Sequence, residues 1–165
     1  MELSGISKYI GANIGGLKSI QYVPINWIDQ STLIELISDS NNFLYSIPLL
    51  PEKTWLNIPY LPTGDEWLES TQPTTQGEVY PQAVSFFVPS LRPDVTAEFA
   101  RMNKMKFLIQ LTDKNQLTWL IGDPRIGLNF SYAGTSGATR GNNNYALSFS
   151  GSMKRPACQY SPTLS

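Results

Sequence analysis

Short apolar runs, many with every second residue apolar, alternate along the chain with clusters of Pro, Gly, Asn and Asp. Such runs are typical of β-strands, and such clusters are typical of the turns between them. The pattern predicts strands at residues 19–23, 33–37, 43–47, 55–58, 66–71, 78–88, 106–112, 117–121, 128–133 and 145–150. The segments 66–71 and 78–88 are expected to form a hairpin around a loop at residues 72–77. Residues 83–88 are apolar or small on both alternating faces, which indicates a strand end that is buried on both sides.

One segment has the helical period instead. Val95, Phe99 and Met102 recur at positions i, i+4 and i+7, which places them on one side of a helix. Pro93 suits the first position of a helix, where its missing N–H is not needed. We therefore predict a helix over residues 93–104 with Phe99 and Met102 in the core.

These elements predict a mainly β fold: a two-sheet antiparallel sandwich or a partly open barrel with one flanking α-helix. The length of 165 residues fits one domain, and no internal repeat of solenoid period is visible. We expect an N-terminal arm at residues 1–18, a single β-rich domain at residues 19–151 and a C-terminal tail at residues 152–165.

The N-terminal arm contains Ile6, Ile10 and Ile14 among four glycines. The spacing of four is helical, but the glycines disfavour a stable helix. Two interpretations remain open at this point. The arm either becomes ordered against a partner or is a frayed terminus.

The composition narrows the possible functions. Charged residues make up 15% of the chain, against about 25% in ordinary proteins, while aromatic residues reach 12%. Residues 1–91 carry three lysines against nine acids, and residues 92–165 carry nine basic residues against four acids, so the balances of −6 and +5 give the net charge of −1. The net charge does not indicate binding to nucleic acid or to an anionic membrane. The opposite charges of the two halves suit a subunit whose unlike faces meet.

The chemistry available to the chain is limited. It contains no histidine and a single cysteine, Cys158, so Ser-His and Cys-His pairs, histidine metal sites and intrachain disulfides are excluded. Met1–Gly5 does not resemble a signal peptide, and no apolar run approaches the ~20 residues of a membrane span. We expect a soluble protein without metal or cofactor that is made in the cytoplasm.

Asp65, Glu66 and Glu69 form an acidic cluster around Trp67. Paired carboxylates beside an aromatic ring are the residue types of a sugar-cleaving site. A small enzyme is therefore one alternative. We expect no catalytic activity, because the chain has no histidine and the other candidate carboxylates, Asp113 and Asp123, occupy turn positions.

Residues 134–144 are rich in glycine and asparagine, which predicts a long mobile loop between the last two hairpin strands. We hypothesise that this loop becomes ordered only against a neighbouring subunit. Gly137, Arg140, Gly141 and Asn143 would then lie in the interface, with Arg140 against the acidic cluster of residues 65, 66 and 69. The alternative is a flexible hairpin tip without a partner.

Several segments carry a resemblance to a known group of proteins. Residues 15–24 read GGLKSIQYVP, residues 107–113 read FLIQLTD, residues 119–124 read WLIGDP, and residues 144–151 read NYALSFSG. Together they resemble small virion proteins encoded among the morphogenesis genes of tailed phages and prophages of Bacteroides-like gut bacteria. The order of strands and helix also resembles the tail-tube fold of tube and head-to-tail neck proteins.

The resemblance implies a structural virion protein of the tail tube or neck, without catalytic residues. Its partners would be copies of itself in a ring, sixfold in a tube or twelvefold at a neck, and neighbouring virion proteins. Genomic DNA would pass through the lumen without specific binding. The remaining alternative is a carbohydrate- or surface-binding module that uses Trp55, Tyr60 and Trp67 in a groove.

Overall fold

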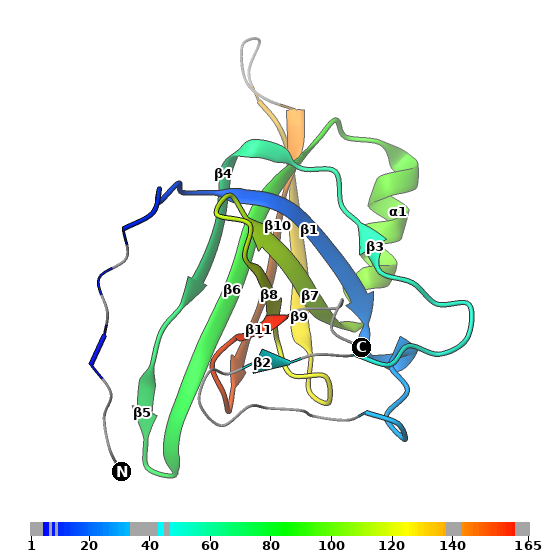
Figure 1. The fold of residues 1–165 in the computed structure, drawn as a ribbon. Coiled ribbons are helices and arrows are strands. Elements are labelled where there is room, and N and C mark those ends of the chain that lie inside the picture. The colour runs from blue at the N-terminus through cyan, green and yellow to red at the C-terminus, as the bar shows by residue number, and fades with distance from the viewer. Residues whose placement is uncertain are drawn as a thin grey trace.

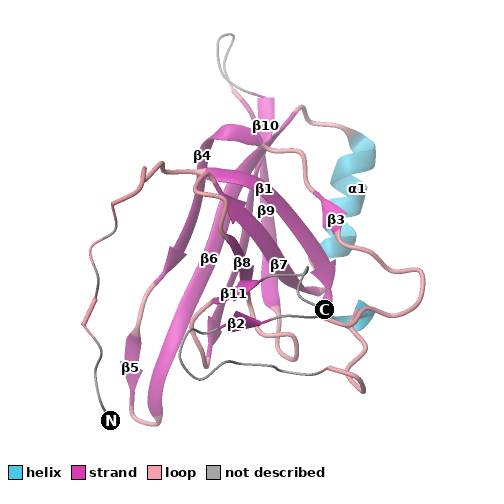
Figure 2. Cartoon of the chain, viewed as in Figure 1, coloured by secondary structure: helices cyan, strands magenta, loops and turns pink. Residues whose placement is uncertain are grey.

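The computed structural model describes residues 5, 6, 8, 10–33, 43, 44, 47–137 and 143–160. Their strands form one large, strongly curved sheet, with a single α-helix at its side (Figures 1 and 2). The strands are β1 (Leu17–Pro24), β2 (Phe43–Leu44), β3 (Leu56–Asn57), β4 (Leu61–Glu69), β5 (Gln72–Thr74), β6 (Gly77–Pro89), β7 (Lys106–Asp113), β8 (Thr118–Ile121), β9 (Leu128–Ser136), β10 (Asn143–Met153) and β11 (Cys158–Tyr160). The helices are η1 (Ile25–Trp27), a 3-10 turn, and α1 (Pro93–Met102).

The sheet has the order β2-β11-β8-β7-β9-β10-β6-β4, and β1 pairs with β3 and β7 at its side. All of these pairings are antiparallel except that of β11 with β2. The predicted mainly β, antiparallel fold with one principal helix is confirmed. Among the described strands the hydrogen bonding follows one open sheet, without a break that would separate two sheets.

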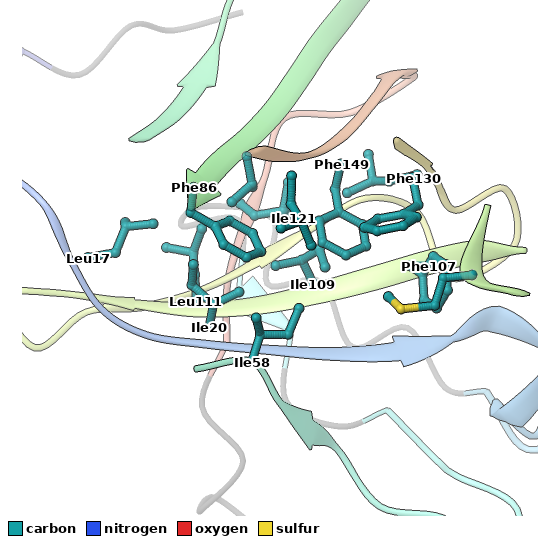
Figure 3. Packing of buried hydrophobic residues seen from close by; sticks show 14 of the residues in the cluster. Leu17, Ile20, Ile58, Phe86, Phe107, Ile109, Leu111, Ile121, Phe130 and Phe149 are labelled. Atoms are coloured by element: carbon teal, nitrogen blue, oxygen red, sulfur yellow. The ribbon is translucent and has the colours of Figure 1, made fainter. Parts of the chain in front are cut away.

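The main core lies on the concave side of this sheet. Every second residue of β6, β10 and β9 points inward, as the period of a strand requires. Phe86, Phe149, Phe130 and Phe107 meet there with ring centroids 5.0–6.1 Å apart in the contacting pairs, and Figure 3 shows them in one cluster with Ile20 of β1 and Ile109 of β7. This aromatic cluster joins strands that are far apart in the sequence.

Strand β7 is buried on both faces. Ile109 and Leu111 face the main core, whereas Leu108 faces a second cluster of buried residues with Leu120 of β8 and Tyr160 of β11. Val23, Ile28 and Ile47 complete that second cluster. The continuous apolar run of residues 107–109 follows from this position, because a strand between two cores needs apolar side chains on both sides.

Helix α1 covers one end of the main core, and Figure 1 shows it beside β3. Phe99 and Met102 are buried, as predicted. The Phe99 ring lies 5.0 Å from the Tyr145 ring and 5.7 Å from the Phe130 ring. The helix begins at Pro93 as predicted and ends at Met102, two residues earlier than expected.

Strand residues occupy part of two expected loops. In the segment 72–77, β5 pairs with the start of β6 in the register Thr74↔Gly77, so only Thr75 and Gln76 form the turn. In the segment 134–144, β9 runs to Ser136 and β10 begins at Asn143, with these two residues opposite each other. The expected lengths of both loops were wrong because polar Thr, Asn and Gly residues also fill strands where a neighbouring strand accepts their backbone hydrogen bonds.

The ends of the domain also differ from the sequence analysis. The expected tail at residues 152–165 contains the end of β10 and strand β11, whose Tyr160 is buried in the second cluster. The predicted strand at 33–37 lies outside the described residues, apart from Leu33, and of the strand at 43–47 only residues 43 and 44 are described as strand.

Candidate functional site

The acidic cluster lies on strand β4, where the period of two divides it between the two faces of the sheet. Asp65, Trp67 and Glu69 point to the inner side, and Glu66 and Leu68 point to the outer side. The three carboxylates therefore do not converge on one cleft.

Asp65 holds the beginning of strand β1. Its Oδ2 atom accepts a hydrogen bond of 2.7 Å from the backbone N–H of Leu17. The Tyr60 hydroxyl donates to the carbonyl oxygen of the same leucine over 2.8 Å. Burial raises the pKa of Tyr60, and the negative charge of Asp65 adds to this effect. Asp65 thus serves as an acceptor between two strands of its own chain.

Glu69 belongs to a polar network around Gln82, a buried residue of β6. Glu69 Oε2 accepts hydrogen bonds from Gln82 Nε2 over 2.8 Å and from the backbone N–H of Ala157 over 2.6 Å. Gln82 Oε1 in turn accepts one from the N–H of Gly122 over 2.9 Å. The network fixes β4, β6, the end of β8 and the segment before β11 to one another.

The sequence analysis missed Gln82. A signal was present, because Gln82 is in phase with the inward residues Val84, Phe86 and Val88 of the same strand. A glutamine at such a position is buried, and a buried amide requires hydrogen-bond partners.

The outer face of β6, β9 and β10 has three rows of uncharged residues, and Lys106 of β7 lies opposite Asn129 at the end of one of them. Across neighbouring strands, Ser85, Ser148 and Ser131 lie opposite one another in one row. The parallel rows contain the sets Ala83, Ser150, Asn129 and Phe87, Ala146, Ala133. Within β6, β9 and β10, all of whose residues are described, no outward position of these rows is charged. Glu66 adds a carboxylate at the β4 end of the serine row.

A groove of about 680 Å³ lies on this outer face, lined by Leu68, Ala83, Ser150 and Gly151 among others. Leu68 is 58% exposed at its β4 side. The groove therefore combines small side chains and one exposed leucine with the polar residues Glu69, Gln82 and Asn129.

The aromatic residues considered for carbohydrate binding do not form a platform. Trp55 packs near Tyr160 in the second cluster, with ring centroids 6.3 Å apart. Trp67 lies against Trp119 at 5.3 Å, and its indole N–H is buried without a hydrogen-bond partner among the described residues. Tyr60 packs on Phe86 and uses its hydroxyl on β1.

A second hollow, of about 370 Å³, lies between α1 and strands β1 and β3. Its walls include Tyr22, Arg92, Asp94 and Glu98. Burial raises the pKa of Tyr22, and Glu98 contributes to the same shift. The hollow thus combines a phenol with charges of both signs, which the sequence pattern of the helix did not indicate.

The four loop residues expected in an interface are only partly described. Gly137 follows the end of β9, and Asn143 is the exposed first residue of β10, paired with Ser136. Arg140 and Gly141 lie outside the described residues. The expected contact of Arg140 with the acidic cluster therefore remains a hypothesis.

In the part of the chain that the structure describes, no group of three or more Asp, Glu, His or Cys residues is placed to hold a metal ion. The Cys158 thiol is half-buried and points to the carbonyl oxygen of Pro156 at 3.9 Å. None of the described helices is long and apolar enough to cross a membrane.

Comparison with known proteins gives no match: no protein-family model fits the chain, and no curated protein and no solved structure is significantly similar to it.

Proposed function

We propose that the protein is a structural subunit of a tailed-phage virion, a tail-tube or head-to-tail neck component that assembles into a ring of identical subunits. The observation that carries this proposal is the outer face of β6, β9 and β10, where three neighbouring rows of outward residues carry no charge. Charged residues are depleted in the centres of protein interfaces, whereas a surface facing water ordinarily contains them.

The fold supports the same function. An antiparallel sheet with one flanking helix has the elements of the tail-tube fold, in which a sandwich or partly open barrel closes into a ring. Strand β4 pairs with β6 alone among the described strands, so it presents an open edge. Such edges are a hazard for an isolated protein, and assembly removes the hazard.

The acidic residues support a structural role over catalysis. Asp65 and Glu69 accept backbone hydrogen bonds from their own chain, and Glu66 points to the opposite face. The carbohydrate-binding alternative is supported less, because Trp55, Tyr60 and Trp67 pack separately against the two cores.

The test is the location of the protein in phage particles released by the bacterium that carries the gene. We expect immunogold labelling at the tail or the neck, and a copy number per particle, from quantitative mass spectrometry, that is a multiple of six. Absence from the particles, or isolated monomers on the capsid, would overturn the proposal. Specific binding to immobilised polysaccharide, combined with absence from particles, would favour the carbohydrate-binding module.

A matched pair of variants tests the outer face itself. Ser148→Arg places a long cation in the middle of the serine row, between Ser85 and Ser131, whereas Thr75→Arg places it in the exposed β5–β6 turn. Both variants should fold, as judged by circular dichroism. We expect only Ser148→Arg to be excluded from particles, and equal incorporation of the two would contradict a role for this face.

A further inference from the structure

The N-terminal arm ends in a fixed position on the domain. Asn115, in the turn between β7 and β8, accepts a hydrogen bond of 3.0 Å from the backbone N–H of Ile14 and donates one of 3.3 Å to the carbonyl oxygen of the same residue. Its amide also donates to the Asn13 side chain at 3.4 Å. The described residues that precede this clamp lie outside the sheet, on the side of the molecule where Figure 1 shows β4 and β5.

The arm exposes its apolar side chains to water. Ile6 is fully exposed, and Ile10 and Ile14 are 92% and 53% exposed. In an extended chain, residues separated by an even number face the same side, so Ile6, Lys8 and Ile10 share one face of a strand. Burying these isoleucines would stabilise an assembled state, and within the described part of the chain they remain exposed.

The open edge of β4 has the complementary pattern. Its outward residues Glu66 and Leu68 are both exposed, and they are two positions apart. Pairing Lys8 with Glu66 places an isoleucine opposite Leu68 in either strand direction, Ile6 if antiparallel and Ile10 if parallel. Lys8 is the charged side chain among the described residues that precede Ile14, and Glu66 is the charged one of the two outward residues of this edge, so the charges are complementary as well.

The arm of the same chain is poorly placed to make this contact. Its exit at Leu17 is held by Asp65 on the inner side of β4, and Ile14 is held by Asn115. Ile14 and Leu17 are therefore held by other parts of the fold, and the residues before them would have to turn back to reach the outer side of β4. A second copy of the chain has no such constraint.

We propose that the N-terminal arm of one subunit adds as a strand to the β4 edge of a second copy, with Lys8 beside Glu66 and an isoleucine beside Leu68. This inference rests on the proposed assembly and names the contact that joins two subunits. Main-chain hydrogen bonds supply affinity in strand addition, and alternate side chains supply register.

The test is disulfide trapping between two full-length variants that carry Cys158→Ser. One has Lys8→Cys and a purification tag, and the other has Glu66→Cys without a tag. Oxidation of the mixture should give a cross-linked heterodimer, because opposed residues in neighbouring strands meet the distance requirement of a disulfide. The control pairs Lys8→Cys with Asn103→Cys, an exposed position directly after α1, and should give at least tenfold less product.

Two further measurements separate the outcomes. Ile6→Asp and Ile10→Asp together should lower the yield of cross-linked heterodimer at least tenfold, whereas Ile126→Asp, which changes a 43% exposed isoleucine in a turn, should not.

A chain with both Lys8→Cys and Glu66→Cys that forms only an intramolecular disulfide at low concentration would overturn the proposal, as would no cross-link at all. If the heterodimer forms but the protein is absent from phage particles, the strand addition stands and the virion function fails; if the protein is in particles without this cross-link, the reverse holds.

Discussion

The backbone N–H of Leu17 donates a 2.7 Å hydrogen bond to the Asp65 carboxylate, although their strands, β1 and β4, are not paired in the sheet. Tyr60 holds the carbonyl oxygen of Leu17 at the same time. These two hydrogen bonds join β1 to β4 and to Tyr60 at a place where β1 and β4 share no ladder of main-chain hydrogen bonds. An acidic residue that resembled part of a catalytic cluster in the sequence therefore has a structural role.

Replacing Asp65 with alanine should lower the free energy of unfolding by about 1.5–3 kcal/mol, the range for a hydrogen bond to a charged group. The bond is partly buried, which places the expected value at the lower end. Urea unfolding followed by tryptophan fluorescence measures this change. Glu66→Ala, one position away and exposed, is the control and should change stability by less than about 0.5 kcal/mol. Equal effects of the two variants would contradict the assigned role.

Gln82→Leu should lower the free energy of unfolding, although leucine and glutamine side chains have similar shapes. The change leaves the N–H of Gly122 without its acceptor and removes a partner of Glu69. A buried group without a hydrogen bond costs about 1–3 kcal/mol. Gln76→Leu in the exposed β5–β6 turn is the matched control. A Gln82→Leu protein as stable as this control in urea would show that the network contributes nothing.

Phe99→Ala should cost about 3–5 kcal/mol, as large aromatic-to-alanine changes in cores do. The ring contacts Phe130, Tyr132 and Tyr145, so the whole end of the core under α1 loses its packing. Glu98→Ala, on the same helix, removes only the exposed ion pair with Arg101 and should cost less than about 1 kcal/mol. Calorimetric melting of both variants would show the difference, and similar melting temperatures would contradict it.

Stability should fall at alkaline pH. Burial raises the pKa of Tyr22, Tyr60 and Tyr160 above the ordinary value, which is about 10 in an unfolded chain. The folded state therefore holds phenolic protons that the unfolded state releases first. The stability that these tyrosines contribute is complete below about pH 10 and is lost as the pH rises toward their folded pKa values. Urea midpoints measured from pH 8 to 12 should decrease above pH 10, over the range in which tyrosinate absorbance rises. A constant midpoint would contradict the raised pKa values.

Local patterns were sufficient for part of the fold. The stripe of Val95, Phe99 and Met102 predicted α1 and its buried face, because a helix is determined by residues close in sequence. Strand β11 was missed because three residues after a proline carry little periodicity, and their pairing with β8 depends on a distant strand. The loop at 134–144 was assigned too many residues for the same reason.

The sequence predicted which residue types gather at the candidate site, but not what each of them contacts. The sequence placed Asp65, Glu66 and Glu69 together, but the period of the strand separates Glu66 from the other two. Their partners, Leu17 and Ala157, lie far away in the chain and contribute backbone N–H groups, which every residue type carries. No sequence motif distinguishes such a donor, so the role of these carboxylates required the structure.

The order of the strands also determines when the protein can complete its fold. Strand β1 finds its partner in β7, and β2 finds its partner in β11, so the earliest strands must wait for the latest ones to be synthesised. Folding dominated by such distant pairings is slow, on the order of milliseconds to seconds. During translation, β1 has only the short strand β3 as a partner until residue 113 has left the ribosome, and β2 lacks β11 until residue 160 has. The nascent chain is therefore open to aggregation for most of its synthesis, and chaperones that hold unpaired strands should raise its yield.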